Sequence, residues 1–436
     1  RGARAALDPP ASAAPRTLRG LDALNFFLAD VRDGLGPYLA IYLVAVRGPE
    51  GGWDEATTGL VITIAGLTGL LAQTPAGALI DGSRRKRAIV IAAALAVTIS
   101  CLAIPYLESF AAVAASQSLA AIAGAIFPPA LAAITLGVVG PRLFARRIGR
   151  NEAFNHAGNA ASAALAAGGA ILFGPLVVFW LMAALAVLSI GAMLMVPGRA
   201  IDHRQARGLA SGAAEEKAST GEAPSGLATL LGDRALMTFA LLMAAFHLAN
   251  AAMLPSLGQL LARSIGQEHA TSLIALCILA AQCVMVPVAL LAGAKADRWG
   301  RKPLFLAAFG VLALRGVLYV LSDSPYWLMA VQLLDGIGAG LFGALFPVVV
   351  ADLTRGTGRF NVAQGAIATA QGLGAALSAS LAGGLIVAAG FDAAFLTLGG
   401  IAAAGFFAYW LLMPETRPDS VAAGGEPPAA TLQPAE

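Results

Sequence analysis

Apolar runs of about 20 residues, separated by short polar turns, fill most of this chain, and an α-helix needs a run of that length to cross a membrane. Glycine and proline interrupt many of the runs, which membrane helices tolerate better than soluble ones. We therefore expect an all-α integral membrane protein with twelve transmembrane helices, at residues 21–45, 56–80, 88–106, 110–138, 150–173, 176–196, 235–262, 270–294, 303–321, 326–353, 360–388 and 392–413.

Polar segments divide these runs into two groups of six. The expected organisation is an N-terminal tail at 1–19, a six-helix bundle at 20–196, a linker at 197–234, a second six-helix bundle at 235–413 and a C-terminal tail at 414–436. Glycine, serine, proline and charged residues in the linker predict a flexible connection. The last segment, rich in proline, alanine and glutamate, is expected to be disordered.

Basic residues are distributed unequally among the connecting segments. If both termini face the cytoplasm, the outside loops contain only Arg47 and Arg263, while Arg32 and Arg315 fall within spans. Cytoplasmic loops of membrane proteins carry the excess of Lys and Arg. This asymmetry predicts cytoplasmic termini, and the high Ala, Gly and Arg usage suggests the inner membrane of a bacterium.

Composition excludes several other classes of protein. The chain is 58% hydrophobic and only 12% charged, whereas soluble proteins carry about 25% charged residues. A formal net charge of +3 gives no reason to expect a nucleic acid partner. Cys101, Cys277 and Cys283 lie in apolar runs and match no zinc or disulfide pattern. The chain has no phosphate-binding loop and no nucleophile motif, so we expect no enzyme activity, no metal and no cofactor. We expect a monomer surrounded by lipid.

A short charged motif occurs once in each half of the chain. In the second copy the motif positions are Gly293, Asp297, Arg298, Gly300, Arg301 and Lys302. In the first copy the matching positions are Gly77, Asp81, Arg85 and Lys86. A repeat of half the chain predicts two similar membrane bundles in one polypeptide.

This motif, Gly-x-x-x-Asp-Arg-x-Gly-Arg-Lys, resembles the signature of the major facilitator superfamily, and the resemblance covers the chain from about Leu21 to Pro414. The first copy departs from the signature, with Gly82 where Arg is usual and Arg84 where Gly is usual. The resemblance implies a secondary transporter with two pseudo-symmetric six-helix bundles. It also implies alternating access, with the small-molecule cargo near the middle of the membrane.

The excess of basic residues in the cytoplasmic loops does not explain why the motif contains aspartates. An acid at the end of a span can bind the positive end of a neighbouring helix or a facing arginine. The resemblance implies latches between the two bundles, with Asp81 near Arg359 and Asp297 near Arg150. Simple exposure of these acids to solvent is the alternative.

Asp30 and Asp33 are candidates for proton coupling. Asp30 lies about 14 Å into the first span, close to the middle of the membrane, and Asp33 shares its helix face. Charges at this depth are costly and face a bundle interior or water. The resemblance adds that an acid in this span is common in proton-driven exporters. The alternatives are a structural ion pair with Arg32, and a span that begins later in the chain.

Arg315 and Asp335 are the conspicuous charges of the second bundle. Because an unpaired buried charge is costly, we expect these two residues to neutralise one another as a structural pair. Asp335 is also the alternative proton site.

Other polar residues within the spans predict a weakly charged cavity. The candidates for contact with the cargo are Arg32, Gln117, Asn155, His156, Asn159, His247, Asn250, Gln332 and Gln371. A lone histidine in a membrane helix is more often a hydrogen-bonded structural group.

Proton-coupled efflux of an amphipathic drug, metabolite or chelator is therefore the favoured function. Proton-coupled uptake is the close alternative. The resemblance implies that exporters of the superfamily often carry a Gly-Pro-rich signature in the fifth span, and this span lacks it. A non-transporting receptor on the same scaffold is the alternative of another class.

Overall fold

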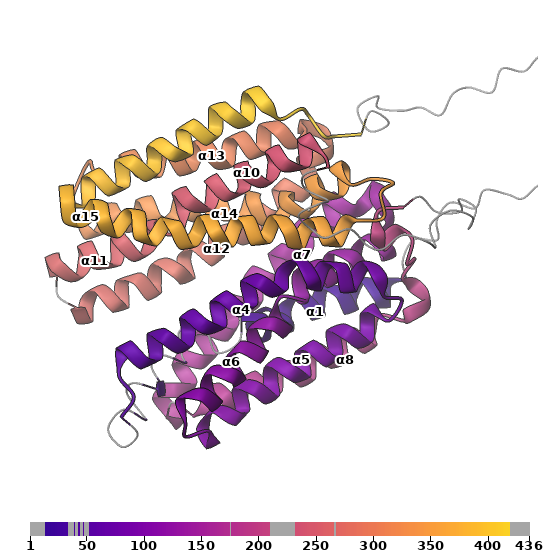
Figure 1. The fold of residues 1–436 in the computed structure, drawn as a ribbon, viewed down its shortest axis with the longest axis horizontal. Coiled ribbons are helices and arrows are strands. Elements are labelled where there is room, and N and C mark those ends of the chain that lie inside the picture. Colours follow the sequence, from indigo (N-terminus) through magenta and orange to yellow (C-terminus); the bar gives the residue numbers. More distant parts are fainter. Residues whose placement is uncertain are drawn as a thin grey trace, which may run out of the picture.

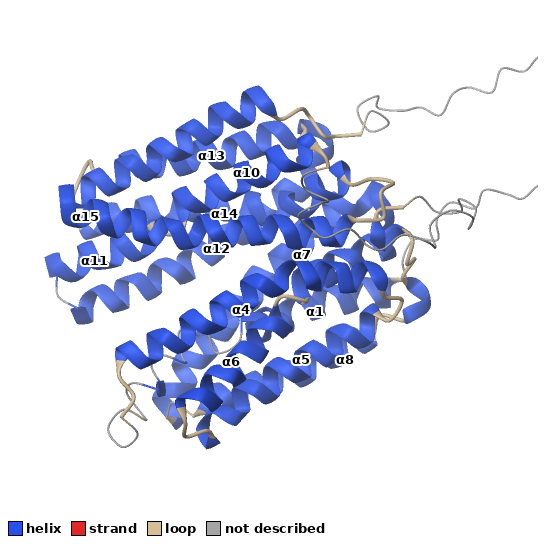
Figure 2. Cartoon of the chain, viewed as in Figure 1, coloured by secondary structure: helices blue, strands red, loops and turns tan. Residues whose placement is uncertain are grey.

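The computed structural model describes residues 14–33, 39, 42, 43, 47, 52–174, 176–209, 232–265 and 267–418. Within this part of the chain the regular elements are helices, joined by short loops (Figure 2). The rest of the predicted first span, most of the linker and most of both tails lie outside the described residues.

The helices form two groups (Figure 1). The N-terminal half contains α1 (Pro15–Asp33), α4 (Glu55–Gly82), α5 (Lys86–Ala103), α6 (Phe110–Gly124), α7 (Phe127–Phe173) and α8 (Val177–Leu194). The C-terminal half contains α10 (Arg234–Asn250), α11 (Met253–Ile265), α12 (Gln267–Trp299), α13 (Arg301–Leu318), α14 (Pro325–Leu353) and α15 (Phe360–Leu412). Three short 3₁₀ helices are also described: η2 (Ile104–Tyr106), η3 (Gly198–Ala200) and η4 (Gln205–Arg207).

Eight helical segments of the described chain are long and apolar enough to cross a membrane. Two of the helices, α7 and α15, have 47 and 53 residues and contain kinks at Gly140 (φ 71°) and Gly390 (φ 88°). Positive φ is readily available only to glycine, so these two residues allow each long helix to turn back on itself. The kinks fall between the predicted spans 110–138 and 150–173, and between 360–388 and 392–413. The expected multi-pass membrane fold is confirmed.

Each half has a hydrophobic core. Buried residues of α1, α5, α6 and α8 form the first core, which includes Leu24, Val97 and Met182. The second core fills the C-terminal half and extends to Phe144 and Ile148 of α7. The helix α7 therefore belongs to the N-terminal half by chain order but packs against both halves.

Contacts between the halves are concentrated at one end of the molecule. Residues 70–81 of α4 and 144–156 of α7 meet residues 282–293 of α12 and 360–372 of α15. We call this region, which contains Gly77, Asp81, Gly149, Gly293 and Asn361, the closed end. A methyl group added at Gly149 would lie 2.6 Å from the Gly293 Cα, so the backbones of α7 and α12 touch here.

Replacing Gly149 with valine should therefore keep the closed end apart. A side chain cannot fit between two helix backbones, and relieving such a clash typically costs about 1–3 kcal/mol. We expect a folded, monodisperse protein whose two halves no longer cross-link between α7 and α12. Gly191→Val on α8 is the matched control, because a methyl group there meets nothing within 4 Å. Cross-linking of Gly149→Val at the wild-type level would contradict this prediction.

Candidate functional site

A cavity of about 590 Å³ lies between the two halves, next to the closed end. Its walls come from α1, α4, α6 and α7 on one side and from α10, α14 and α15 on the other. Its polar lining residues are Asn25, Arg32, Gln73, Asn151, Glu152, His247, Gln364 and Gln371. A cavity of this size with a few converging polar groups suits a small organic molecule.

Three of the predicted cargo residues, Arg32, His247 and Gln371, line this cavity. From α1, the lining residues are Asn25 and Arg32, which lie two turns apart on one face. Asp30 is half-buried on the same helix. The helix α1 also includes Asp33, whose side chain lies outside the described residues.

The other predicted residues of the N-terminal half are not among those that line this cavity. On α7, the Asn155 amide donates to Glu152 Oε2 at 3.2 Å. His156 Nδ1 lies 2.8 Å from Gln282 Oε1 of α12, a hydrogen bond between the two halves. Asn159 is half-buried on the same helix, and Gln117 is buried in α6.

Sequence reasoning missed Glu152, the acid that lines the cavity. It lies two residues after Arg150, where the predicted span begins, and so it resembled an interfacial charge. The helix α7 continues unbroken through this region from Pro141, which places Glu152 well inside the helix. Its spacing of four from His156 and three from Asn155 was the available signal.

The predicted pair of Arg315 and Asp335 is confirmed. Arg315 Nη1 lies 2.6 Å from Asp335 Oδ1, and the Arg315 side chain is 2% exposed. The same guanidinium donates to Asn250 Oδ1 at 2.7 Å and to Gln332 Oε1 at 3.1 Å. Tyr319 donates its hydroxyl hydrogen to Gln332. Asn250 and Gln332, predicted to contact cargo, therefore lie in this cluster, because a buried guanidinium needs several acceptors.

Asp81 connects the two halves at the closed end. Its carboxylate accepts hydrogen bonds from the Asn361 side-chain amide (2.7 Å), the Asn361 backbone N–H (3.1 Å) and the Val362 backbone N–H (2.8 Å). These N–H groups belong to the first turn of α15, which has no intrahelical acceptors for them and carries the positive end of the helix dipole. The predicted partner Arg359 is instead exposed, so the latch is formed with the helix end and not with that arginine.

The second predicted latch is wrong in its pairing. Arg150 donates to both oxygens of Asp22 at 2.9 Å, and Arg147 donates to Asp22 at 2.7 Å. These two arginines lie one turn apart on α7, so a single carboxylate of α1 can bind both. Asp297 is instead bound by Arg301 of its own motif at 2.8 Å.

Arg301 organises the second copy of the motif. Its side chain is 4% exposed and also binds Asp352 of α14 at 2.9 Å. Glu415 accepts from the backbone N–H groups of Arg301 and Lys302, which caps α13. The first described residues of the C-terminal tail are therefore anchored, contrary to the prediction of disorder from Pro414.

The remaining motif residues have local contacts or are exposed. Gly300 has φ 94°, which lets the chain reverse between α12 and α13. Lys86 is buried and donates to the Ser83 carbonyl at 2.6 Å. Arg85 is exposed, as is Arg298.

The described part of the linker binds both halves. The Asp202 backbone N–H donates to the Gly137 carbonyl at 2.9 Å, and the Gly356 N–H donates to the Gly208 carbonyl at 2.6 Å. Asn361, which holds Asp81, also donates to the Ala206 carbonyl at 2.9 Å. This first stretch of the linker is therefore part of the closed end and not a free connection.

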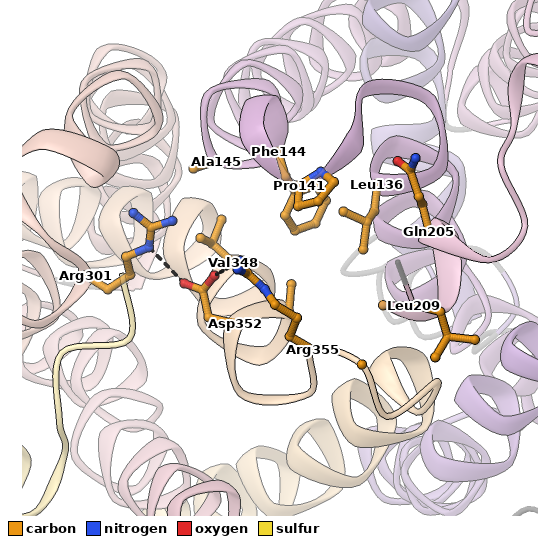
Figure 3. Close-up of a pocket in the computed structure, with 13 residues that line it drawn as sticks. Leu136, Pro141, Phe144, Ala145, Gln205, Leu209, Arg301, Val348, Asp352 and Arg355 are labelled. Carbon is orange, nitrogen blue, oxygen red and sulfur yellow. Dashed lines mark hydrogen bonds and ion pairs between the residues drawn. The ribbon is translucent and has the colours of Figure 1, made fainter. Parts of the chain in front are cut away.

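A second, smaller pocket of about 180 Å³ lies beside the linker at the closed end. Figure 3 shows Pro141 and Phe144 of α7, Leu209 of the linker and the Arg301–Asp352 ion pair around it. Its charged residues are already paired with one another, because Asp352 binds Arg301 and Arg355. This pocket belongs to the contact between the halves.

Comparisons with known proteins agree with this architecture. The model of the Major Facilitator Superfamily matches residues 21–289 and 239–434. Uncharacterized MFS-type transporters from two strains of Mycobacterium tuberculosis are each 53% identical over 402 residues, which cover 92% of this chain and 94% of theirs. The crystal structure of the human organic anion transporter MFSD10 (TETRAN) is similar with a TM-score of 0.64 at 16% identity, over 92% of this chain and 100% of that one. At that identity, the likeness to MFSD10 concerns the fold alone.

Proposed function

Because the chain belongs to the major facilitator superfamily, a family of membrane transporters and not of enzymes, we propose that it moves a small molecule across the cytoplasmic membrane of a bacterium by alternating access. In this proposal twelve helices span the membrane, with both termini in the cytoplasm. The distribution of basic residues supports this orientation. The bacterial relatives support the cytoplasmic membrane.

The position of the central cavity carries the proposal. Both halves contribute to its walls, and the contacts of Asp81, Gly149 and Gly293 close the molecule at one of its ends. A ligand between two bundles that touch at one end gains access to the other side when that contact opens and the opposite ends approach. The closed end is the cytoplasmic end in the proposed orientation.

Proton coupling through Asp30 and Asp33, in the direction of efflux, remains our proposal for the energy source. Both acids belong to α1, the helix that also places Arg32 in the cavity wall. Protonation of a carboxylate within the membrane changes its preference for water or a low-dielectric interior, which can couple proton loading to the state of the cavity. Asp335 is the less favoured coupling residue, because Arg315 already binds it.

The variants Asp30→Asn and Asp33→Asn should fold but lose flux driven by a proton gradient. The amide keeps the shape of the carboxylate and removes the exchangeable proton. The measurement is a transport screen of labelled solutes in inverted vesicles, with and without an uncoupler, and Asp323→Asn at an exposed loop position is the control. Accumulation in inverted vesicles indicates efflux, and uncoupler-sensitive uptake by right-side-out vesicles indicates symport. Full flux in both variants would contradict the coupling assignment, and solute binding without flux in the wild type would favour a receptor.

A further inference from the structure

Glu152 holds a carboxylate at the boundary between the two halves. It is half-buried on α7 and lines the central cavity. A Cβ added at Gly343 of α14 would lie 3.3 Å from Glu152 Oε2, so the carboxylate extends across the cavity to the C-terminal half. Any ligand bound between the halves at this level meets this group.

Among the described residues, Glu152 has a neutral hydrogen-bond partner and not a cation. Its hydrogen bond comes from the neutral amide of Asn155. Within the described part of the chain, Glu152 belongs to no ion pair, whereas an arginine binds each of Asp22, Asp297, Asp335 and Asp352. Acids inside a membrane bundle are costly, and those without a structural partner mark binding or transport pathways.

The wall next to Gly343 is aromatic. Phe342 and Phe346 line the cavity with parallel rings, whose centroids are 5.7 Å apart at an interplanar angle of 5°. Both side chains are half-exposed, and Phe246 stacks behind Phe342 with a centroid distance of 4.9 Å. Rigid aromatic surface beside a carboxylate favours a ligand with a positive group and an apolar body, because ring faces also attract cations.

We propose that the central cavity binds an amphiphilic organic cation, with Glu152 on its positive group and Phe342 and Phe346 against its apolar part. This inference rests on the proposed function, in which this cavity is the transport site. Arg32 is the other charged residue of the lining and favours anions, but it already makes an interaction within the protein. Glu152, which has no ion-pair partner among the described residues, therefore sets the preferred charge of the ligand.

Tetraphenylphosphonium and tetraphenylborate test this proposal, because they have the same shape and opposite charge. Binding of each ion to the purified full-length protein in detergent is measured by equilibrium dialysis. We expect the wild type to bind the phosphonium and to prefer it over the borate. Glu152→Gln should weaken phosphonium binding by at least about ten-fold, the effect of removing one charge from a partly buried contact.

Two further variants control for the charge of Glu152 and for the effect of removing any acid. Glu152→Asp retains the charge and should bind the phosphonium better than Glu152→Gln, and Glu108→Gln, at an exposed loop position, should bind like the wild type. Size-exclusion chromatography checks the fold of each variant. Equal affinity for the two ions, or unchanged phosphonium binding in Glu152→Gln, would overturn the cation site. Binding of the phosphonium that depends on Glu152 but gives no flux in vesicles would uphold the site and overturn the transport proposal instead.

Discussion

Replacing Arg315 with leucine is expected to destabilise the C-terminal half by about 3–5 kcal/mol, the usual cost of removing one partner from a buried ion pair. Arg315 donates to Asp335, to the Asn250 amide oxygen and to the Gln332 amide oxygen, which also accepts from Tyr319. Leucine leaves a carboxylate and two amide oxygens without that donor in a low-dielectric interior. Unfolding by sodium dodecyl sulfate from mild detergent micelles, followed by circular dichroism, measures the change in free energy.

The double variant Arg315→Leu with Asp335→Leu separates the two contributions to this loss. It removes both charges, so it should be more stable than Arg315→Leu alone, and a double-mutant cycle gives the coupling energy between the two positions. Arg315→Lys keeps the charge but offers fewer donors in a less rigid arrangement and should be intermediate. Arg142→Leu, at an exposed position, is the control. A single variant as stable as Arg142→Leu would show that the cluster adds little.

The features that depend only on the order of apolar and charged residues along the chain could be predicted from the sequence. Apolar runs indicate spanning helices because the membrane sets their length. The pairing of Arg315 with Asp335 also follows from the sequence alone, because two isolated charges in adjacent apolar helices have few other partners. The apolar runs end before Gly140 and Gly390 and begin again after them, so the sequence indicated a break at each place. In the structure only that one glycine departs from helical geometry in each long helix.

The charges near the membrane surface could not be paired in this way. Several acids and arginines lie within reach of one another there, and the choice depends on helix orientation. Arg150 thus binds Asp22 of its own half and not Asp297. For Asp81 the sequence allowed either the positive end of a helix or a facing arginine, and it could not identify the helix, since two of the partners are backbone N–H groups. Every residue has such a group, and only the position of the α15 terminus makes these available.

The hydrogen bonds of Asp81 should determine the fraction of molecules in which the closed end is shut. Asp81→Ala removes an acceptor of three hydrogen bonds from the start of α15, two from the backbone and one from the Asn361 side chain. Hydrogen bonds to a charged group contribute about 1.5–3 kcal/mol each, so the ratio of shut to open protein should fall by at least about ten-fold. Spin labels at Arg84 and Thr357, both exposed on opposite halves near this end, report the change as longer distances in pulsed electron resonance. The native cysteines are replaced first.

Asn361 provides the control for the mechanism of this shift. Asn361→Ala removes one of the three hydrogen bonds to Asp81 and also the bond to the Ala206 carbonyl of the linker, so it should open the closed end on its own. If Asp81 acts through the α15 terminus, the double variant should open the closed end by less than the sum of the single effects. Glu108→Ala, far away along the chain and exposed, should leave the distances unchanged. Wild-type distances in Asp81→Ala would mean that the backbone contact of Gly149 with Gly293 is sufficient to hold the halves together.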